Sequence, residues 1–280
     1  MGLFPEKMYE GQSWRRKHGE PKNRIQLFQC VLTDQFFSLI PVNLLYLLFW
    51  FPAMAWSVFC YTQVTVFQQA GDGVQIVATI NTWMLGLIPC LTFVGPARAG
   101  MARLMRDWAK EEYSPVLATF FKGMRQNWKQ TLPFAFLEGA LPVAVWGAYQ
   151  IAVAGGFTGV SAVVFWVICA VALLYLMAMQ VFYTLLVTYD LKLKYHFRNA
   201  VLLLLLKLPR FLIIRALSWI FLLIFLALAV ALPDAVYTNL LIPIVYYGSV
   251  GMAITELLYA SYANKLCDDH LTKEEEEEAQ

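Results

Sequence analysis

The stretch FFSLIPVNLLYLLFWFPAMAWSVFCY, from Phe36 to Tyr61, decides the fold. It lies within 37 residues between Asp34 and Asp72 that include no charged side chain. A hydrocarbon core about 30 Å thick is crossed by about 20 helical residues, so this stretch is long enough to span a bilayer. We therefore predict a transmembrane helix here, bent at Pro41 and Pro52.

The remainder of the chain has the same character. Of its 280 residues, 60% are hydrophobic and only 14% are charged, which is outside the usual range of a soluble domain. We predict an all-α polytopic membrane protein, a six-helix transmembrane bundle with spans at about 36–61, 74–95, 131–153, 158–189, 209–232 and 239–262. A cytoplasmic segment at 1–35 precedes the transmembrane domain at 36–262, and an acidic cytoplasmic tail at 263–280 follows it.

The basic residues lie on one side of this arrangement. All 21 Lys and Arg residues fall in the N-terminal segment, after span two, around the entry to span five, or in the tail. The seven that follow span two begin with Arg98. Because cytoplasmic segments are enriched in Lys and Arg, we expect both termini in the cytoplasm of a bacterium and the bundle in its plasma membrane.

The segment after span two predicts an amphipathic helix from Ser114 to Gln130. Ser114 and Pro115 form a pair typical of a helix cap and first turn. Apolar side chains then recur at helical spacing, opposite a basic face. Such a helix lies on the membrane surface or docks a cytoplasmic partner, through Phe121, Lys122, Arg125, Trp128 and Lys129.

Three ionisable residues fall inside the proposed spans, where burial of charge is costly and functional residues are common. Glu138, Arg215 and Glu256 lie at similar depths when counted along their helices at about 1.5 Å per residue. We expect them to form one ion-paired cluster. Two interpretations stay open: a structural clamp that sets helix register, or a relay for protons or substrate.

Amide side chains also fall within the spans. Because lipid offers an amide no hydrogen-bond partner, such groups are expected to bond between helices more often than to bind a ligand. This expectation covers Asn43, Asn81, Gln150 and Gln180.

Enzymatic function is not supported by any motif. The chain has no H-E-x-x-H, G-x-S-x-G or P-loop pattern. Its five cysteines include no C-x-x-C pair, so we expect no metal and no cofactor. Topology accounts for the basic residues, which leaves no case for nucleic-acid binding. The acidic run from Glu274 to Glu278 is typical of a solvated tail.

Several stretches resemble the YesL-like family of bacterial membrane proteins. They are the run from Leu39 to Leu45, the Gly95-Pro96-Ala97 turn leading to Arg103 and Trp108, and Phe120-Phe121 followed by Asn127, Lys129 and Gln130. The resemblance is strongest from about residue 35 to 135 and includes the Met1-Gly2-Leu3-Phe4 start.

The resemblance implies a role without catalytic residues. Genes of that family commonly lie beside carbohydrate ABC importers, which implies an accessory or regulatory membrane subunit of an oligosaccharide importer. Its partners would be the permease subunits, together with the ATPase and sugar-binding protein, and the lipid bilayer. The alternatives are a free-standing transporter of sugar or another small solute, and a membrane regulator of a sensor kinase.

Overall fold

The computed structural model describes residues 24–110, 112, 114–232 and 235–264, and these residues form helices and no strand. Five helices are long and apolar enough to cross a membrane, and a bent helix pair supplies a sixth span if it is counted as one. This confirms an all-α, multi-pass membrane protein. The elements are α2 (Arg24–Asp34), α3 (Phe36–Ala70), α4 (Gly73–Ala109), α5 (Val116–Ala154), α6 (Gly159–Thr188), α7 (Leu193–Leu206), α8 (Leu208–Ser218), α9 (Ile220–Ala231), α10 (Val236–Tyr246) and the π-helix η3 (Tyr247–Gly251).

The second span is longer than the sequence predicts. We placed a turn at Gly95-Pro96-Ala97, but Pro89 and Pro96 both lie inside α4, which continues to Ala109. A proline within a membrane helix is tolerated where neighbouring helices surround it. Here Gly95 and Ala97 are buried against other helices. The prediction of a turn was therefore wrong, and Arg98 belongs to the helix rather than to a loop.

The separate surface helix was also a wrong prediction. Residues 116–130 form the first part of α5, which runs without a break to Ala154. Pro115 occupies the N-cap position, and Ser114 instead donates its hydroxyl to Asp107 Oδ2 at 2.7 Å. The side chains named for its contact surface are nevertheless all exposed: Phe121, Lys122, Arg125, Trp128 and Lys129.

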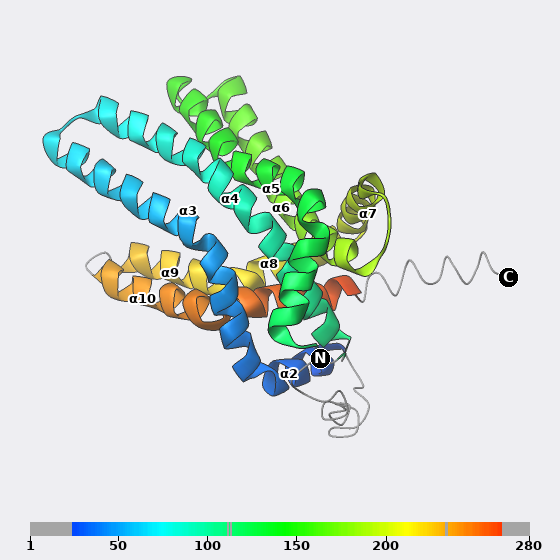
Figure 1. Ribbon diagram of the computed structural model, residues 1–280. Coiled ribbons are helices and arrows are strands. Elements are labelled where there is room, and N and C mark those ends of the chain that lie inside the picture. Colours follow the sequence, from blue (N-terminus) through cyan, green and yellow to red (C-terminus); the bar gives the residue numbers. More distant parts are fainter. Residues whose placement is uncertain (1–23, 111, 113, 233–234, 265–280) are drawn as a thin grey trace.

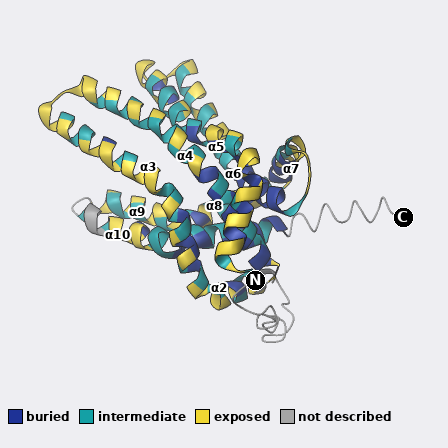
Figure 2. Ribbon diagram, in the orientation of Figure 1, coloured by how far each residue is buried: buried dark blue, intermediate teal, exposed yellow. Residues whose placement is uncertain are grey.

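The helices converge at one end and diverge at the other (Figure 1). Three hairpins, α3–α4, α5–α6 and α9–α10, extend outward from a common base. Buried residues gather in that base, whereas the outer halves of the hairpins are mostly exposed or half-buried (Figure 2). Two apolar clusters fill the base, and α4 contributes to both, Ala97 to one and Ala99 to the other. The helix α4 is therefore the centre of the packed region.

An antiparallel seam of small residues joins α4 to α5. A Cβ atom added to Gly139 would lie 2.8 Å from the Ile88 carbonyl oxygen, and one added to Gly100 would lie 2.5 Å from that of Phe120. Contacts this close leave no room for a side chain, so the two backbones pack directly, as small residues permit in membrane helices.

We predict that Gly139→Ala destabilises the protein although alanine favours helix formation. The new methyl group would force α4 and α5 apart, whereas Gly147 on the same helix has no neighbour within 4 Å of its Cβ position. Thermal unfolding in detergent would show a lower Tm for Gly139→Ala and an equal or higher Tm for Gly147→Ala. An equal drop for both variants would contradict the seam.

Asn43 joins α3 to the π-helical turn of the last span. Its Nδ2 donates to the carbonyls of Tyr247 and Gly248 at 2.9 and 3.0 Å, and its Oδ1 accepts from the Ala253 amide at 3.0 Å. A π-helical turn disrupts the regular ladder of backbone hydrogen bonds. Asn43 is fully buried, and it gives these two carbonyl groups and this amide their hydrogen-bond partners.

We predict that Asn43→Leu costs about 1–3 kcal/mol of stability, because buried backbone groups would lose their partners. Hydrogen exchange would show faster exchange around Ala253 in this variant. Asn43→Asp should be at least as harmful, since its carboxylate would face two carbonyl oxygens. Unchanged exchange at Ala253 in both variants would show that Asn43 does not support the π-helical turn.

The fifth predicted span is broken at Trp219, where α8 and α9 meet at 60°. The Tyr247 hydroxyl donates to the Ser218 carbonyl at the break (2.9 Å), and the Phe221 and Tyr246 rings stack with centroids 3.9 Å apart. These contacts fix the base of the α9–α10 hairpin.

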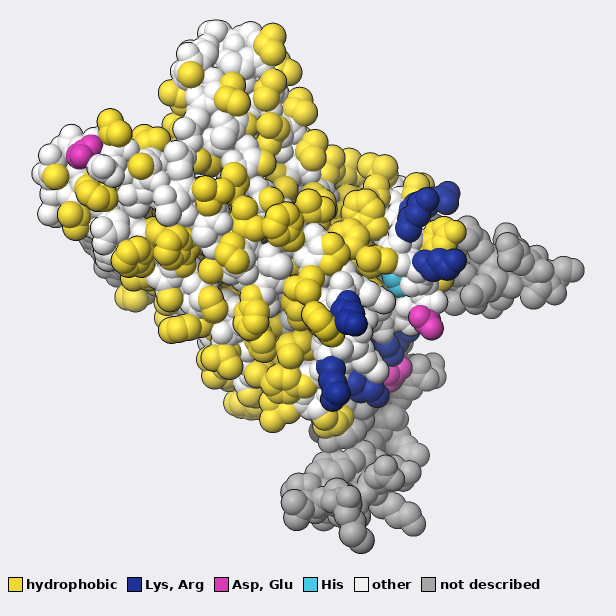
Figure 3. Space-filling model, turned by 45° about the horizontal axis from the view of Figure 1, so that its top comes forward, with side chains coloured by type: hydrophobic (Ala, Val, Ile, Leu, Met, Phe, Trp, Pro, Cys, Tyr) yellow, Lys and Arg dark blue, Asp and Glu magenta, His cyan; other side chains and the backbone are white. Residues whose placement is uncertain are grey.

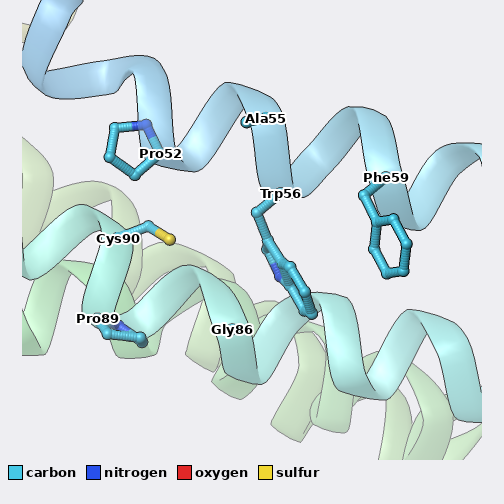
Figure 4. A pocket seen from close by; sticks show the side chains of 7 residues that line it. All are labelled: Pro52, Ala55, Trp56, Phe59, Gly86, Pro89 and Cys90. Carbon is cyan, nitrogen blue, oxygen red and sulfur yellow. The ribbon is translucent and has the colours of Figure 1, made fainter.

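An apolar groove of about 640 Å³ lies between α3 and α4 (Figure 4). The Trp56 ring points toward Gly86, and its Nε1 donates to the Trp83 carbonyl at 3.1 Å. Pro52, Pro89 and Cys90 line the rest of the groove. Its lining is apolar apart from the Cys90 thiol and the Trp56 N–H group.

Candidate functional site

A buried ion-pair cluster is centred on Arg98. Its Nη1 lies 2.7 Å from Glu138 Oε1, and its Nε lies 3.3 Å from Glu256 Oε1. The guanidinium also stacks over the Tyr183 ring, 4.7 Å from its centroid. The three charged side chains are only 12–14% exposed. One cation from α4 thus holds carboxylates from α5 and from the last helix described, residues 252–264, which follows η3.

Arg98 was missed as a cluster residue because the sequence places it just after a predicted turn. Small residues flank it closely, with Gly95, Ala97, Ala99, Gly100 and Ala102 all buried. That density of small residues is typical of close packing between membrane helices and is the signal that could have placed Arg98 inside. The structure brings Glu138 and Glu256 together, but on Arg98 rather than on Arg215.

Arg215, on α8, has a separate set of neighbours. Its Nη2 donates to the Leu176 carbonyl at 2.9 Å. The side-chain oxygen of Gln180 faces Arg215. This oxygen accepts from Arg215 Nη1 at 2.7 Å and from the Tyr259 hydroxyl at 2.9 Å. The Trp219 and Tyr259 rings lie against the guanidinium. Among the described residues, no carboxylate lies within 4.0 Å of Arg215.

The last helix connects the two guanidinium groups. Glu256 contacts Arg98, and Tyr259, three residues later, bonds to Ser218 and Gln180 beside Arg215. The polar groups therefore link α4, α5, α6, α8 and the last helix in one network. Such an arrangement fixes the relative positions of the helices, since each charge has a partner only in this packing.

The remaining amides of the spans bond between helices, which confirms the prediction for them. Asn81 Oδ1 on α4 accepts from Trp146 Nε1 at 2.7 Å and from Gln150 Nε2 at 2.8 Å, both on α5. Asn43 and Gln180 bond across helices as described above.

Charge on the surface is polarised along the molecule (Figure 3). In that view Lys and Arg gather at the end where the hairpins converge, and the hairpins extend away from it with almost no charge. The described residues include no group of three or more His, Cys, Asp or Glu side chains that could hold a metal ion.

Comparison with known proteins gives one match. Residues 36–146 match a family described as "Protein of unknown function, DUF624". The match covers α3, α4 and most of α5, which are the helices of the glycine seam and of the Arg98–Glu138 pair. A search of curated proteins and a search of solved structures found no match.

We predict that Arg98→Gln lowers the free energy of unfolding by about 3–5 kcal/mol, because two buried carboxylates would lose their cation. Arg215→Gln should cost less, since its partners are neutral groups that retain other contacts. Denaturation in detergent would rank the two variants.

A triple variant provides the control. Arg98→Gln combined with Glu138→Gln and Glu256→Gln removes all three charges and should recover part of the lost stability, since no carboxylate is left unpaired. If the triple variant is less stable than Arg98→Gln alone, the loss of stability in Arg98→Gln does not come from the unpaired carboxylates of Glu138 and Glu256.

Proposed function

We propose that this chain is a non-catalytic accessory or regulatory membrane subunit of a bacterial carbohydrate ABC importer. It would pack against the permease subunits, in an assembly that includes their ATPase and the sugar-binding protein. The proposal has two parts, the role of subunit and the identity of the complex, and different observations support them.

The observation that carries the role of subunit is the α9–α10 hairpin. All twelve residues of α9 are apolar, and none of them is buried. Its contacts within the described chain are mainly with α10 and with the end of α8. At about 1.5 Å per residue α9 is about 18 Å long, shorter than a hydrocarbon core of about 30 Å. A short apolar helix that leaves its own bundle is well suited to pack against a helix of another protein.

The buried charges also suit a scaffold. Arg98 is neutralised by Glu138 and Glu256 in a fixed geometry. A relay would need groups that change partners along a hydrated path, whereas these groups are held by mutual contacts. This favours the structural clamp over the relay for the network.

The identity of the complex is supported by the resemblance to the YesL-like family, whose genes accompany carbohydrate importers. The orientation is part of the proposal as well. Placing the basic end in the cytoplasm follows the positive-inside tendency and puts both termini inside, in a bacterial plasma membrane. The three hairpin tips would then face outward.

We predict that the tagged chain, isolated from its native membranes, brings the permease subunits and the ATPase with it. Leu226→Trp on α9 and Val245→Trp on α10 should lower their recovery about tenfold, the equivalent of about 1.4 kcal/mol. The matched controls are Val167→Trp and Val171→Trp on α6, because these valines are as exposed as the α9 and α10 positions. Quantitative mass spectrometry of the eluate measures the amounts of permease subunits and ATPase relative to the tagged chain.

Two other outcomes would contradict the proposal. If the chain is isolated alone and transports sugar into liposomes, it is a free-standing transporter. If its deletion alters induction of the operon while uptake by a constitutively expressed importer stays normal, it regulates a sensor kinase instead.

A further inference from the structure

A polar hollow lies at the basic end, where α5 passes the connection between α6 and α7. The helix α6 ends at Thr188, and the backbone is extended at Tyr189 and Lys192 before α7 begins at Leu193. The space between this extended segment and α5 has a volume of about 380 Å³. Side chains that line it include Gln126, Asn127, Gln130, Thr188, Asp190 and His196.

Positive charge surrounds this hollow. Arg106 Nη1 donates to the Val187 carbonyl in its wall at 3.1 Å, and Arg103 donates to Gln126 Oε1. Lys122 lies one turn before Gln126 on the exposed side of α5, Lys129 precedes Gln130, and Lys192 follows Leu191. The opposing charges are Asp190 in the lining and the two carboxylates that pair with Arg106, Asp107 at 3.2 Å and Glu112 at 3.3 Å. The local balance favours an anion.

His196 adds a second indication that the hollow receives a polar group. Its side chain is 1% exposed, and its Nδ1 has no hydrogen-bond partner among the described residues. Burial lowers the pKa of this imidazole, so it is neutral at pH 7 despite the nearby Asp190. A carboxylate oxygen in the hollow would accept a hydrogen bond from this nitrogen in the tautomer that carries the proton on Nδ1.

The chain itself carries a matching segment. Residues 265–280 lie outside the described residues and include seven acidic and two basic side chains, with Glu274–Glu278 in an unbroken run. The described helix ends close by, since Tyr262 packs against Phe211 at 5.0 Å and joins the apolar cluster that includes Tyr189 and Leu193. Nine residues separate Asn264 from Glu274, and the ten steps between these two residues reach up to about 35 Å when extended.

We propose that the acidic run Glu274–Glu278 docks intramolecularly in the polar hollow between α5 and the α6–α7 connection. The carboxylates pair with Lys122, Lys129 and Lys192, which neighbour its lining residues in the sequence, and accept hydrogen bonds from its carboxamides and from His196. Because the run is tethered, its effective concentration at the hollow is in the millimolar range.

The test uses the full chain in nanodiscs of phosphatidylcholine, treated with a zero-length carbodiimide that joins carboxylates to lysines. Mass spectrometry should find Glu274–Glu278 joined to Lys122, Lys129 or Lys192. The yield should fall several-fold when salt shortens the Debye length from about 10 Å at 0.1 M to about 3 Å at 1 M. Lys207, at the junction of α7 and α8 and outside the hollow, is the internal control.

A variant with Glu274→Gln through Glu278→Gln keeps the length of the segment and removes its charge. Hydrogen exchange at residues 189–192 should become faster in this variant. Cross-links absent from the three lysines, or spread equally to Lys207, would overturn the proposal. A second result would also overturn it: residues 189–192 are protected from exchange only when phosphatidylglycerol is added, and the glutamine substitutions do not change that protection. The hollow would then hold a lipid headgroup.

Discussion

The contact of one guanidinium with two carboxylates is the constraint on which the rest of the structure depends. Arg98 stands on α4 among buried small residues and meets Glu138 from α5 and Glu256 from the last helix. Charges in an apolar environment are stable only when they are paired, so these three helices have few alternative arrangements. The glycine seam between α4 and α5 is compatible with this contact, because it brings the two backbones close enough for the side chains to meet.

The sequence was sufficient to predict the multi-pass membrane class and the proximity of Glu138 to Glu256. It was insufficient for Arg98, because Pro96 indicated a turn where surrounding helices stabilise a continuous α4. No proline or glycine near Trp219 predicts the break between α8 and α9. The break is stabilised instead by a hydrogen bond from Tyr247, which is distant in the sequence. The π-helical turn likewise depends on a residue far away in the sequence, since Asn43 donates a hydrogen bond to the Tyr247 carbonyl from 204 residues away. Features of this kind arise from tertiary contacts and leave no local pattern.

A tight base and diverging hairpins give the molecule two different surfaces. The base holds the polar network, the apolar clusters and the surface cations, whereas α9 and α10 present apolar side chains on nearly all sides. A rigid base with an unpartnered hairpin is a reasonable design for a subunit that joins a larger membrane assembly. In the proposed orientation the basic end faces the cytoplasm, where the docking proposed for Glu274–Glu278 would occupy part of its surface.

A cryo-electron-microscopy map of the particle isolated from native membranes tests the central claim most directly. The account predicts that Glu138 and Glu256 both contact Arg98, while Arg215 contacts Gln180, and that helices of another protein lie against α9 and α10. A map in which the two carboxylates contact Arg215, or in which the chain's own helices cover α9, would contradict it.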